Sequence, residues 1–82
     1  MTVTAEQDAT CRLALDIAVK HELMLVLGTM LKTEYRDEGL HLSARRGEYA
    51  TTAFMYWSAK HQEEFFTQLF DMWVRDFRKV GL

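Results

Sequence analysis

The sequence predicts a small α+β domain with the element order α-β-β-β-α, in which two helices cover one face of a three-stranded antiparallel meander. Apolar and polar side chains alternate over residues 40–45, the period of two that is typical of a half-buried strand. The short polar segments 36–39 and 46–47 flank this run and each contains a glycine, as hairpin loops do. Residues 4–27 and 58–80 keep a helical period instead.

An all-α arrangement is the alternative fold. Two long helices over about residues 5–37 and 44–80 would form a hairpin that dimerises into a four-helix bundle. Gly47 and the pair Thr51-Thr52 disfavour it, because all three residues have low helix propensity and would lie inside the second helix.

The first helix is predicted to begin after Thr4. Thr4 and Gln7 have the spacing of a capping box, in which each side chain binds the backbone N–H of the other residue. A solvent-facing row of alternating charge follows at i,i+4 spacing: Asp8, Arg12, Asp16 and Lys20. The helix is expected to end near Leu27, with Gly28 in the left-handed conformation that often follows a helix.

The first strand is expected over Thr29–Tyr35. Pairing Tyr35 with Leu40 across the four-residue loop Arg36–Gly39 brings six side chains to one face: Leu31, Thr33, Tyr35, Leu40, Leu42 and Ala44. All of them except Thr33 are apolar or aromatic, and a slip of one residue would destroy this agreement. The sequence therefore predicts the register of this hairpin.

The third strand is expected to run from Glu48 toward Trp57. A two-residue loop at Arg46-Gly47 would set Arg45 opposite Glu48 as an ion pair across the strands. In that register Phe54 and Tyr56 face away from the helices and extend beyond the second strand. The end of this edge strand, Phe54–Trp57, would then have no partner within the monomer.

The last helix is predicted over Ala59 to about Val80, with Ser58 as its N-cap. Its apolar stripe comprises Phe66, Leu69, Phe70, Trp73, Phe77 and Val80, and is widened by Phe65, Met72 and Val74. This stripe is wider than one sheet contact needs, so the excess is expected to pack on the first helix or on another chain. Asp76 falls inside the wide arc and is expected to find an arginine or a backbone donor there.

Size and composition indicate a single domain over residues 1–82. The net charge is −2 with acids and bases interspersed, which disfavours a large basic surface for nucleic acid or an anionic membrane. Cys11 is the one cysteine, so an intrachain disulfide is impossible and a reducing, cytoplasmic location is expected. The sequence has neither the pattern of a signal peptide nor an apolar run long enough to span a bilayer.

The sequence contains no recognisable catalytic, metal-binding or cofactor-binding motif. None of the three histidines has another histidine at i+3 or i+4, and Cys11 has no cysteine partner for zinc. Ser43 and His41 share a predicted strand face, but a serine hydrolase also needs an orienting acid and an oxyanion hole. The four glycines are isolated, so no phosphate-binding loop is present. A non-enzymatic chain that binds no cofactor is therefore expected.

The surplus of aromatic side chains favours a protein-interaction module, a regulator, inhibitor or adaptor that forms a homodimer and docks on another protein. The candidate interface residues are Phe54, Tyr56, Trp57, Phe65 and Met72. A polar patch on the outer strand face, with Lys32, Glu34, His41 and Arg45, is a further candidate and includes the groups that a small enzyme or ligand binder would use. The alternative function is nucleic-acid binding through the outer sheet face by Lys32, Arg45 and Arg46.

The segment Ser58-Ala59-Lys60-His61-Gln62-Glu63-Glu64 bears on the nucleic-acid alternative. The order α-β-β-β-α resembles that of double-stranded-RNA-binding domains, whose second helix begins with lysines that grip phosphates. The resemblance covers the element order alone, because the matching segment here has one lysine and two acids. It therefore implies the fold and not the binding of RNA.

Overall fold

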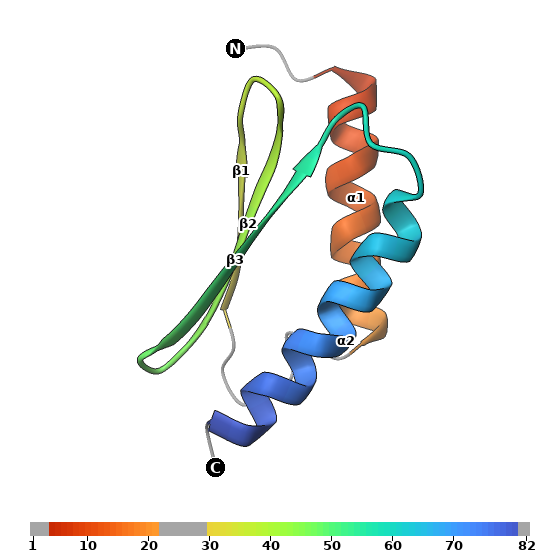
Figure 1. Cartoon of the computed structure of the whole chain (residues 1–82). Helices are drawn as coiled ribbons and strands as arrows, with labels where there is room; N and C mark the ends of the chain where they lie inside the picture. Colours follow the sequence, from red (N-terminus) through yellow and green to blue (C-terminus); the bar gives the residue numbers. More distant parts are fainter. Residues whose placement is uncertain (1–3, 22–29, 81–82) are drawn as a thin grey trace.

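The computed structural model describes residues 4–21 and 30–80 and confirms the α+β order. The elements are α1 (Ala5–Lys20), β1 (Met30–Tyr35), β2 (Gly39–Arg46), β3 (Tyr49–Tyr56) and α2 (Gln62–Val80). The strands form one antiparallel sheet in the order β1-β2-β3, and both helices lie on the same side of it (Figure 1). The alternative of two long helices is wrong.

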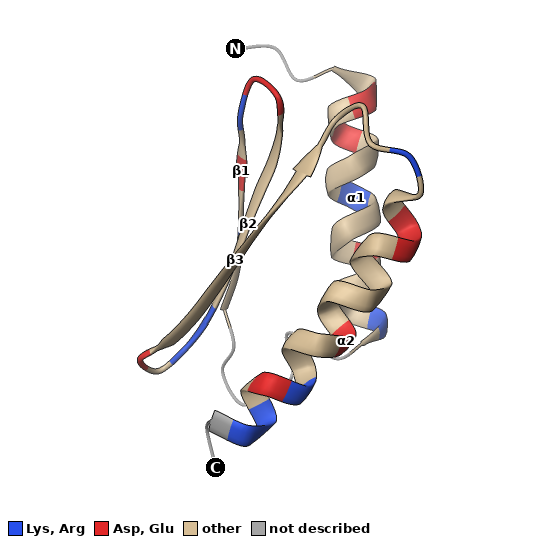
Figure 2. Cartoon of the chain, viewed as in Figure 1, with Lys and Arg blue, Asp and Glu red and all other residues tan. Residues whose placement is uncertain are grey.

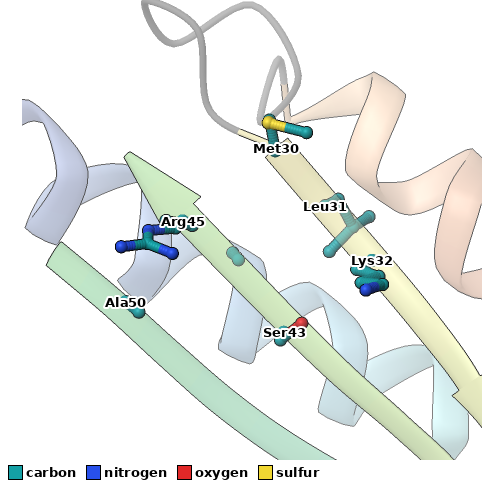
Figure 3. Close-up of a pocket in the computed structure, with 7 residues that line it drawn as sticks. Met30, Leu31, Lys32, Ser43, Arg45 and Ala50 are labelled. Atoms are coloured by element: carbon teal, nitrogen blue, oxygen red, sulfur yellow. The ribbon is translucent and has the colours of Figure 1, made fainter. Parts of the chain in front are cut away.

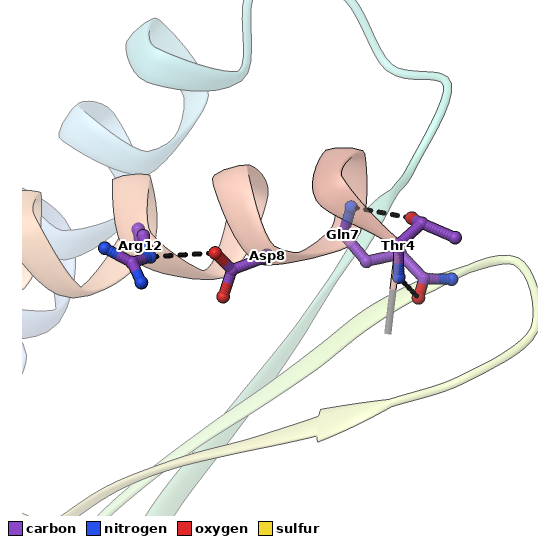
Figure 4. A network of polar contacts seen from close by, with 4 residues as sticks. All are labelled: Thr4, Gln7, Asp8 and Arg12. Atoms are coloured by element: carbon purple, nitrogen blue, oxygen red, sulfur yellow. Dashed lines mark hydrogen bonds and ion pairs between the residues drawn. The ribbon is translucent and has the colours of Figure 1, made fainter. Parts of the chain in front are cut away.

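Helix α1 begins as predicted. Thr4 Oγ1 accepts a hydrogen bond from the Gln7 N–H at 3.1 Å, and the Thr4 N–H donates to Gln7 Oε1 at 3.2 Å (Figure 4). One turn later Arg12 Nε donates to Asp8 Oδ2 at 2.8 Å on the exposed face. The predicted helix end near Leu27 and Gly28 lies outside the described residues.

The register of the first hairpin is the predicted one. Tyr35 pairs with Leu40, Thr33 with Leu42 and Leu31 with Ala44. The Arg36 N–H donates to the Gly39 carbonyl oxygen at 2.9 Å and closes the loop. The alternating burial of β2 follows, since Leu40, Leu42 and Ala44 are buried against the helices.

The register of the second hairpin differs from the prediction. Arg45 pairs with Ala50, so the expected ion pair of Arg45 with Glu48 is wrong. The turn is formed by Gly47 and Glu48, with Gly47 at a φ of +61°. Glycine at the first central position is what a type II′ turn requires, and this turn sets Arg46 opposite Tyr49.

This difference shifts the pairing by two residues along β3 (from residue 48 to residue 50), which leaves every side chain on its predicted face. The far end of the strand changes its environment, because Phe54 now pairs with His41 and Tyr56 with Gly39. In addition, the Trp57 N–H donates to the Glu38 carbonyl oxygen at 3.0 Å. The prediction that this end of β3 lacks a partner is therefore wrong, although β3 is an edge strand.

Helix α2 begins later than predicted, and Ser58 is not its N-cap. The Ala59 N–H donates to the Tyr56 carbonyl oxygen at 3.1 Å, which makes a turn where the helix was expected to begin. His61 then takes a positive φ of 61°, and its carbonyl oxygen accepts the first bond of α2, from the Phe65 N–H at 3.1 Å. The chain thus needs a connection of residues 57–61 to turn from β3 into the helix layer.

The core lies between the sheet and the two helices. Of the predicted α2 stripe, Phe66, Phe70, Trp73 and Phe77 are buried, Leu69 is partly buried, and the side chain of Val80 lies outside the described part. Helix α1 contributes a narrow buried flank on which every side chain except Ile17 is small: Thr10, Cys11, Ala14, Ile17 and Ala18. Small residues on α1 let the large rings of α2 fill the space between the layers.

The three residues predicted to widen the apolar stripe of α2 differ in their burial. Val74 is buried, whereas Phe65 and Met72 are each 45% exposed. Asp76 is half-buried, and among the described residues no hydrogen bond or ion pair joins it to α1, so the predicted partner is not formed there. In residues 4–21 and 30–80 no helix has the length and apolar character that crossing a membrane requires.

Candidate interaction surfaces

The five candidate interface residues do not form one surface. Both helices cover the same face of the sheet, so Phe54 and Tyr56 lie on the uncovered sheet face while Phe65 and Met72 lie on α2. Trp57 belongs to neither group, because it packs against the core. The structure therefore offers two separate surfaces, one on the uncovered sheet face and one on α2.

The first surface is a strip along the exposed side of α2. It comprises Phe65, Gln68, Leu69 and Met72, which line a shallow hollow of about 300 Å³. We call these four residues the α2 strip. At 100° per residue they lie beside the buried stripe of Phe66, Phe70 and Trp73 rather than within it, and the described sheet and α1 leave the strip open.

The charges of α2 are separated along its length. Glu63 and Glu64 lie in the first turn, and Arg78 and Lys79 lie in the last turn (Figure 2). In the middle, Arg75 lies 3.9 Å from Asp71, a weak exposed pair. This polarity complements the helix dipole and makes the first turn of α2 acidic and its last turn basic.

The second surface is the uncovered sheet face, where Phe54 and Tyr56 pack edge to face with ring centroids 5.1 Å apart. The Phe54 ring also lies over Gly39, since a Cβ placed at residue 39 would be 2.8 Å from Phe54 Cε2. Beside it, His41 Nδ1 is buried and has no hydrogen-bond partner among the described residues. Phe54 is thus half-buried within its own chain, and Tyr56 is the more accessible ring at 55% exposed.

Trp57 has a structural role. Its indole Nε1 donates to the Arg36 carbonyl oxygen at 3.0 Å, and its ring packs on Tyr35 with centroids 5.5 Å apart. These contacts tie the residue after β3 to the end of β1 and to the loop that follows it. The part of Trp57 in an interface stays a prediction.

The predicted polar patch is divided by the structure. Glu34 pairs with Arg36 at 2.9 Å, and His41 lies opposite Phe54. Lys32 and Arg45 instead line a second hollow, of about 530 Å³, nearer the start of β1. The four candidate residues therefore share the uncovered face without forming one site.

Arg46 does not lie on the uncovered sheet face. It is 8% exposed, and its Nη1 donates to the Phe77 carbonyl oxygen at 2.7 Å. The reason is that successive side chains of β2 point to opposite faces of the sheet. Arg46 lies two and four residues from the core residues Ala44 and Leu42, so it points to their face. The nucleic-acid alternative thereby keeps two of its three proposed cations, Lys32 and Arg45.

Cys11 lies in the layer between α1 and β1. It is 9% exposed, and its Sγ donates to Thr33 Oγ1 at 3.9 Å. A side-chain hydrogen bond with Cys11 and partial burial raise the pKa of Tyr35 to about 12, because both disfavour the phenolate. Within the part of the chain that the structure describes, the Cys11 thiol thus interacts with the hydroxyl groups of Thr33 and Tyr35, as a structural thiol would.

Gln62 organises the start of α2, and sequence reasoning did not single it out. Its Nε2 lies 3.3 Å from the carbonyl oxygens of both Tyr56 and Trp57, to which it donates. Its Oε1 accepts from Thr10 Oγ1 on α1 at 3.0 Å. One amide thus joins both helices to the end of β3, and these partners are too far apart in sequence for a local pattern to indicate the contact.

The described residues contain no group of three or more histidine, cysteine, aspartate or glutamate side chains placed to hold a metal ion. Comparisons of the chain with protein-family models, with curated proteins and with solved structures gave no match. The function is therefore inferred from the two surfaces described above.

Proposed function

We propose that this chain is a non-enzymatic protein-interaction module that forms a homodimer through the α2 strip. The observation that carries the proposal is the exposure of Phe65 and Met72, each 45%, on a helix whose neighbouring stripe fills the core. Large apolar side chains around a hollow are typical of the centre of an interface.

A second copy of the chain is the partner that the charges of α2 favour. If two α2 helices pair antiparallel about a two-fold axis, the acidic first turn of each lies toward the basic last turn of the other. The helix dipoles are then also antiparallel, which is favourable. A parallel pairing would set like charges together, so the antiparallel arrangement is the expected one.

The lining of the hollow favours binding over catalysis. Phe65, Leu69 and Met72 are apolar, and the fourth lining residue, Gln68, has a neutral amide. None of these side chains exchanges a proton near neutral pH, so the hollow suits packing against apolar side chains. In such a dimer the uncovered sheet faces point outward, and Tyr56 is the ring through which we expect docking on a further protein.

The test is the mass of the protein in solution. Light scattering should give about twice the chain mass of 9.6 kDa for the natural sequence. Met72→Glu and Phe65→Glu should each give a folded monomer, because a carboxylate would be buried at the centre of the interface. Thr67→Glu is the matched control, since Thr67 is exposed on α2 outside the strip, and this variant should remain a dimer.

Two results would contradict the proposal. The first is a mass of 9.6 kDa for the natural sequence at every concentration measured. The second is a dimer that survives both strip substitutions, which would place the interface elsewhere. Circular dichroism of each variant checks that a change of mass does not come from unfolding.

A further inference from the structure

The hollow of about 530 Å³ on the sheet is independent of the α2 strip. The described residues that line it are Met30, Leu31, Lys32, Ser43, Ala44, Arg45 and Ala50. The strand register explains why they meet, because Arg45 pairs with both Met30 and Ala50, and Lys32 pairs with Ser43. Five of these seven residues point to the uncovered face of the sheet, so the hollow opens on that face near the start of β1 (Figure 3).

Two cations in this hollow have no counter-charge. Lys32 and Arg45 are its charged lining residues, and no carboxylate of a described residue lies within ion-pair distance of either. The acid that follows in β1, Glu34, is held by Arg36 at 2.9 Å. The register of the second hairpin sets Ala50 opposite Arg45, where the sequence suggested Glu48.

The Arg45 side chain is held in place. Its Nε donates to the Gly47 carbonyl oxygen at 3.0 Å, a bond within the same turn. That bond leaves the two terminal nitrogens of the guanidinium for a ligand. Arginine donates through such a fork to phosphate and carboxylate oxygens, and a hydroxyl at Ser43 adds a further donor.

The remaining walls are apolar. Met30 is 72% exposed, and the small side chain of Ala50 leaves space above the strands. Pockets for small ligands measure about 300–1,000 Å³ and combine apolar walls with a few polar groups. A bare ion would satisfy the cations without covering Met30 or Ala50. An anionic head on an apolar body matches both parts of the lining.

We infer that this hollow binds a small organic anion, whose phosphate or carboxylate head is held by the Arg45 guanidinium with Lys32 as the second cation of the lining, and whose apolar body packs on Met30 and Ala50. The site lies on the uncovered sheet face and shares no residue with the α2 strip, so it does not rest on the proposed dimer. Binding between exposed cations and an anion weakens as salt rises.

The test is an NMR titration of the full chain with three probes: inorganic phosphate, phenyl phosphate and benzoate. Phenyl phosphate or benzoate should shift the amide signals of residues 30–32, 43–45 and 50, and should bind more tightly than inorganic phosphate. The better of the two aromatic probes identifies the head group. Lys32→Gln and Arg45→Gln should each weaken that binding by about tenfold, the loss expected for one charge-assisted hydrogen bond.

Lys60→Gln is the matched control, because it removes one exposed cation outside the hollow and should leave the affinity unchanged. Three results would overturn the inference. The probes could cause no shifts at these residues, or the Lys32 and Arg45 variants could bind as the natural sequence does. A single-stranded oligonucleotide could also bind more tightly than either aromatic probe and shift signals across the whole sheet face, which would indicate nucleic-acid binding instead.

Discussion

At the scale of single residues, Arg46 shows how a charge predicted to face solvent can serve the fold. The last carbonyl groups of a helix have no partner within the helix, and Phe77 is in this last turn of α2. The guanidinium of Arg46 donates to its oxygen at 2.7 Å from the end of β2. A cation at this position also complements the negative end of the helix dipole. One side chain thus links the second hairpin to the end of the helix layer.

Replacing Arg46 should therefore destabilise the protein more than replacing its neighbour. Arg46→Gln removes a buried, charge-assisted hydrogen bond and should lower the free energy of unfolding by about 2 kcal/mol. Arg45→Gln, at an exposed position, should cost less than about 0.5 kcal/mol. Urea denaturation of both variants measures the difference. Equal losses would mean that the bond to Phe77 contributes little.

Tyr35 should make stability fall at high pH. Its pKa is raised from 10.0 to about 12 in the folded chain, so the neutral phenol is favoured by folding. This contribution is fully present below pH 10 and is lost as the pH rises from 10 to about 12. Tyrosinate absorbance should therefore show one of the three tyrosines ionising later than an ordinary phenol.

The same titration tests the cause. Cys11→Ala removes the hydrogen bond that contributes most to the shift, so the late ionisation should move back toward 10.0. Tyr35→Phe should abolish the late component altogether. If the late component persists in Tyr35→Phe, another tyrosine is responsible.

At the scale of the elements, the two hairpins show what the sequence can and cannot predict. The first register was predictable because a one-residue slip would divide the apolar face that Leu31, Tyr35 and the apolar residues of β2 share, and because the polar segment 36–39 marked the turn. In the second hairpin, registers that differ by two residues place the same side chains on the same face. The turn decides between them, and Gly47 at a φ of +61° selects the one with Arg46 opposite Tyr49.

The start of α2 was not predictable for a different reason. Ser58 is a good N-cap by composition, and the sequence contains no sign that Tyr56–Ala59 forms a turn instead. The decisive contacts are those of Gln62 with Thr10 and with the end of β3, which join residues far apart in the chain. Local sequence rules therefore predict the interior of a helix better than its first residue, which here depends on tertiary contacts.

The two turn glycines should respond differently to alanine. A Cβ at residue 39 would clash with the Met55 carbonyl oxygen and lie 2.8 Å from Phe54 Cε2. Gly39→Ala should thus cost about 1–3 kcal/mol, as overpacking does. At Gly47 the φ of +61° is the obstacle and no atom lies within 4 Å, so Gly47→Ala should cost about 1 kcal/mol.

Gly47→Asn separates the two causes, because asparagine tolerates positive φ better than alanine does. It should recover part of the stability lost in Gly47→Ala, whereas Gly39→Asn should be no better than Gly39→Ala. Thermal unfolding of the four variants checks the order. A Gly39→Ala variant as stable as the natural sequence would show that β3 can move away at no cost.

At the scale of the whole molecule, the sequence indicated that α2 has more apolar surface than one sheet can cover. It did not indicate which residues α1 would cover. The structure buries Val74 and leaves Phe65 and Met72 open, a division that depends on how the two helices lie beside each other. It also gives Phe54 and Trp57, two of the candidate interface residues, contacts within the chain. An interface thus depends on what folding leaves uncovered, which a periodic pattern alone does not determine.

If two copies pair through the α2 strip, stability should depend on protein concentration. Anything that binds the folded chain and not the unfolded chain stabilises it by mass action, and a second copy is such a ligand. The midpoint of thermal unfolding should therefore rise as the natural sequence is concentrated. Above the dissociation constant, each tenfold increase in concentration stabilises the dimer by about 1.4 kcal/mol, or about 0.7 kcal/mol for each chain. In Met72→Glu the midpoint should be independent of concentration, and in Thr67→Glu it should rise as in the natural sequence. A midpoint that stays constant for all three proteins would mean that the strip is covered by something other than a copy of this chain.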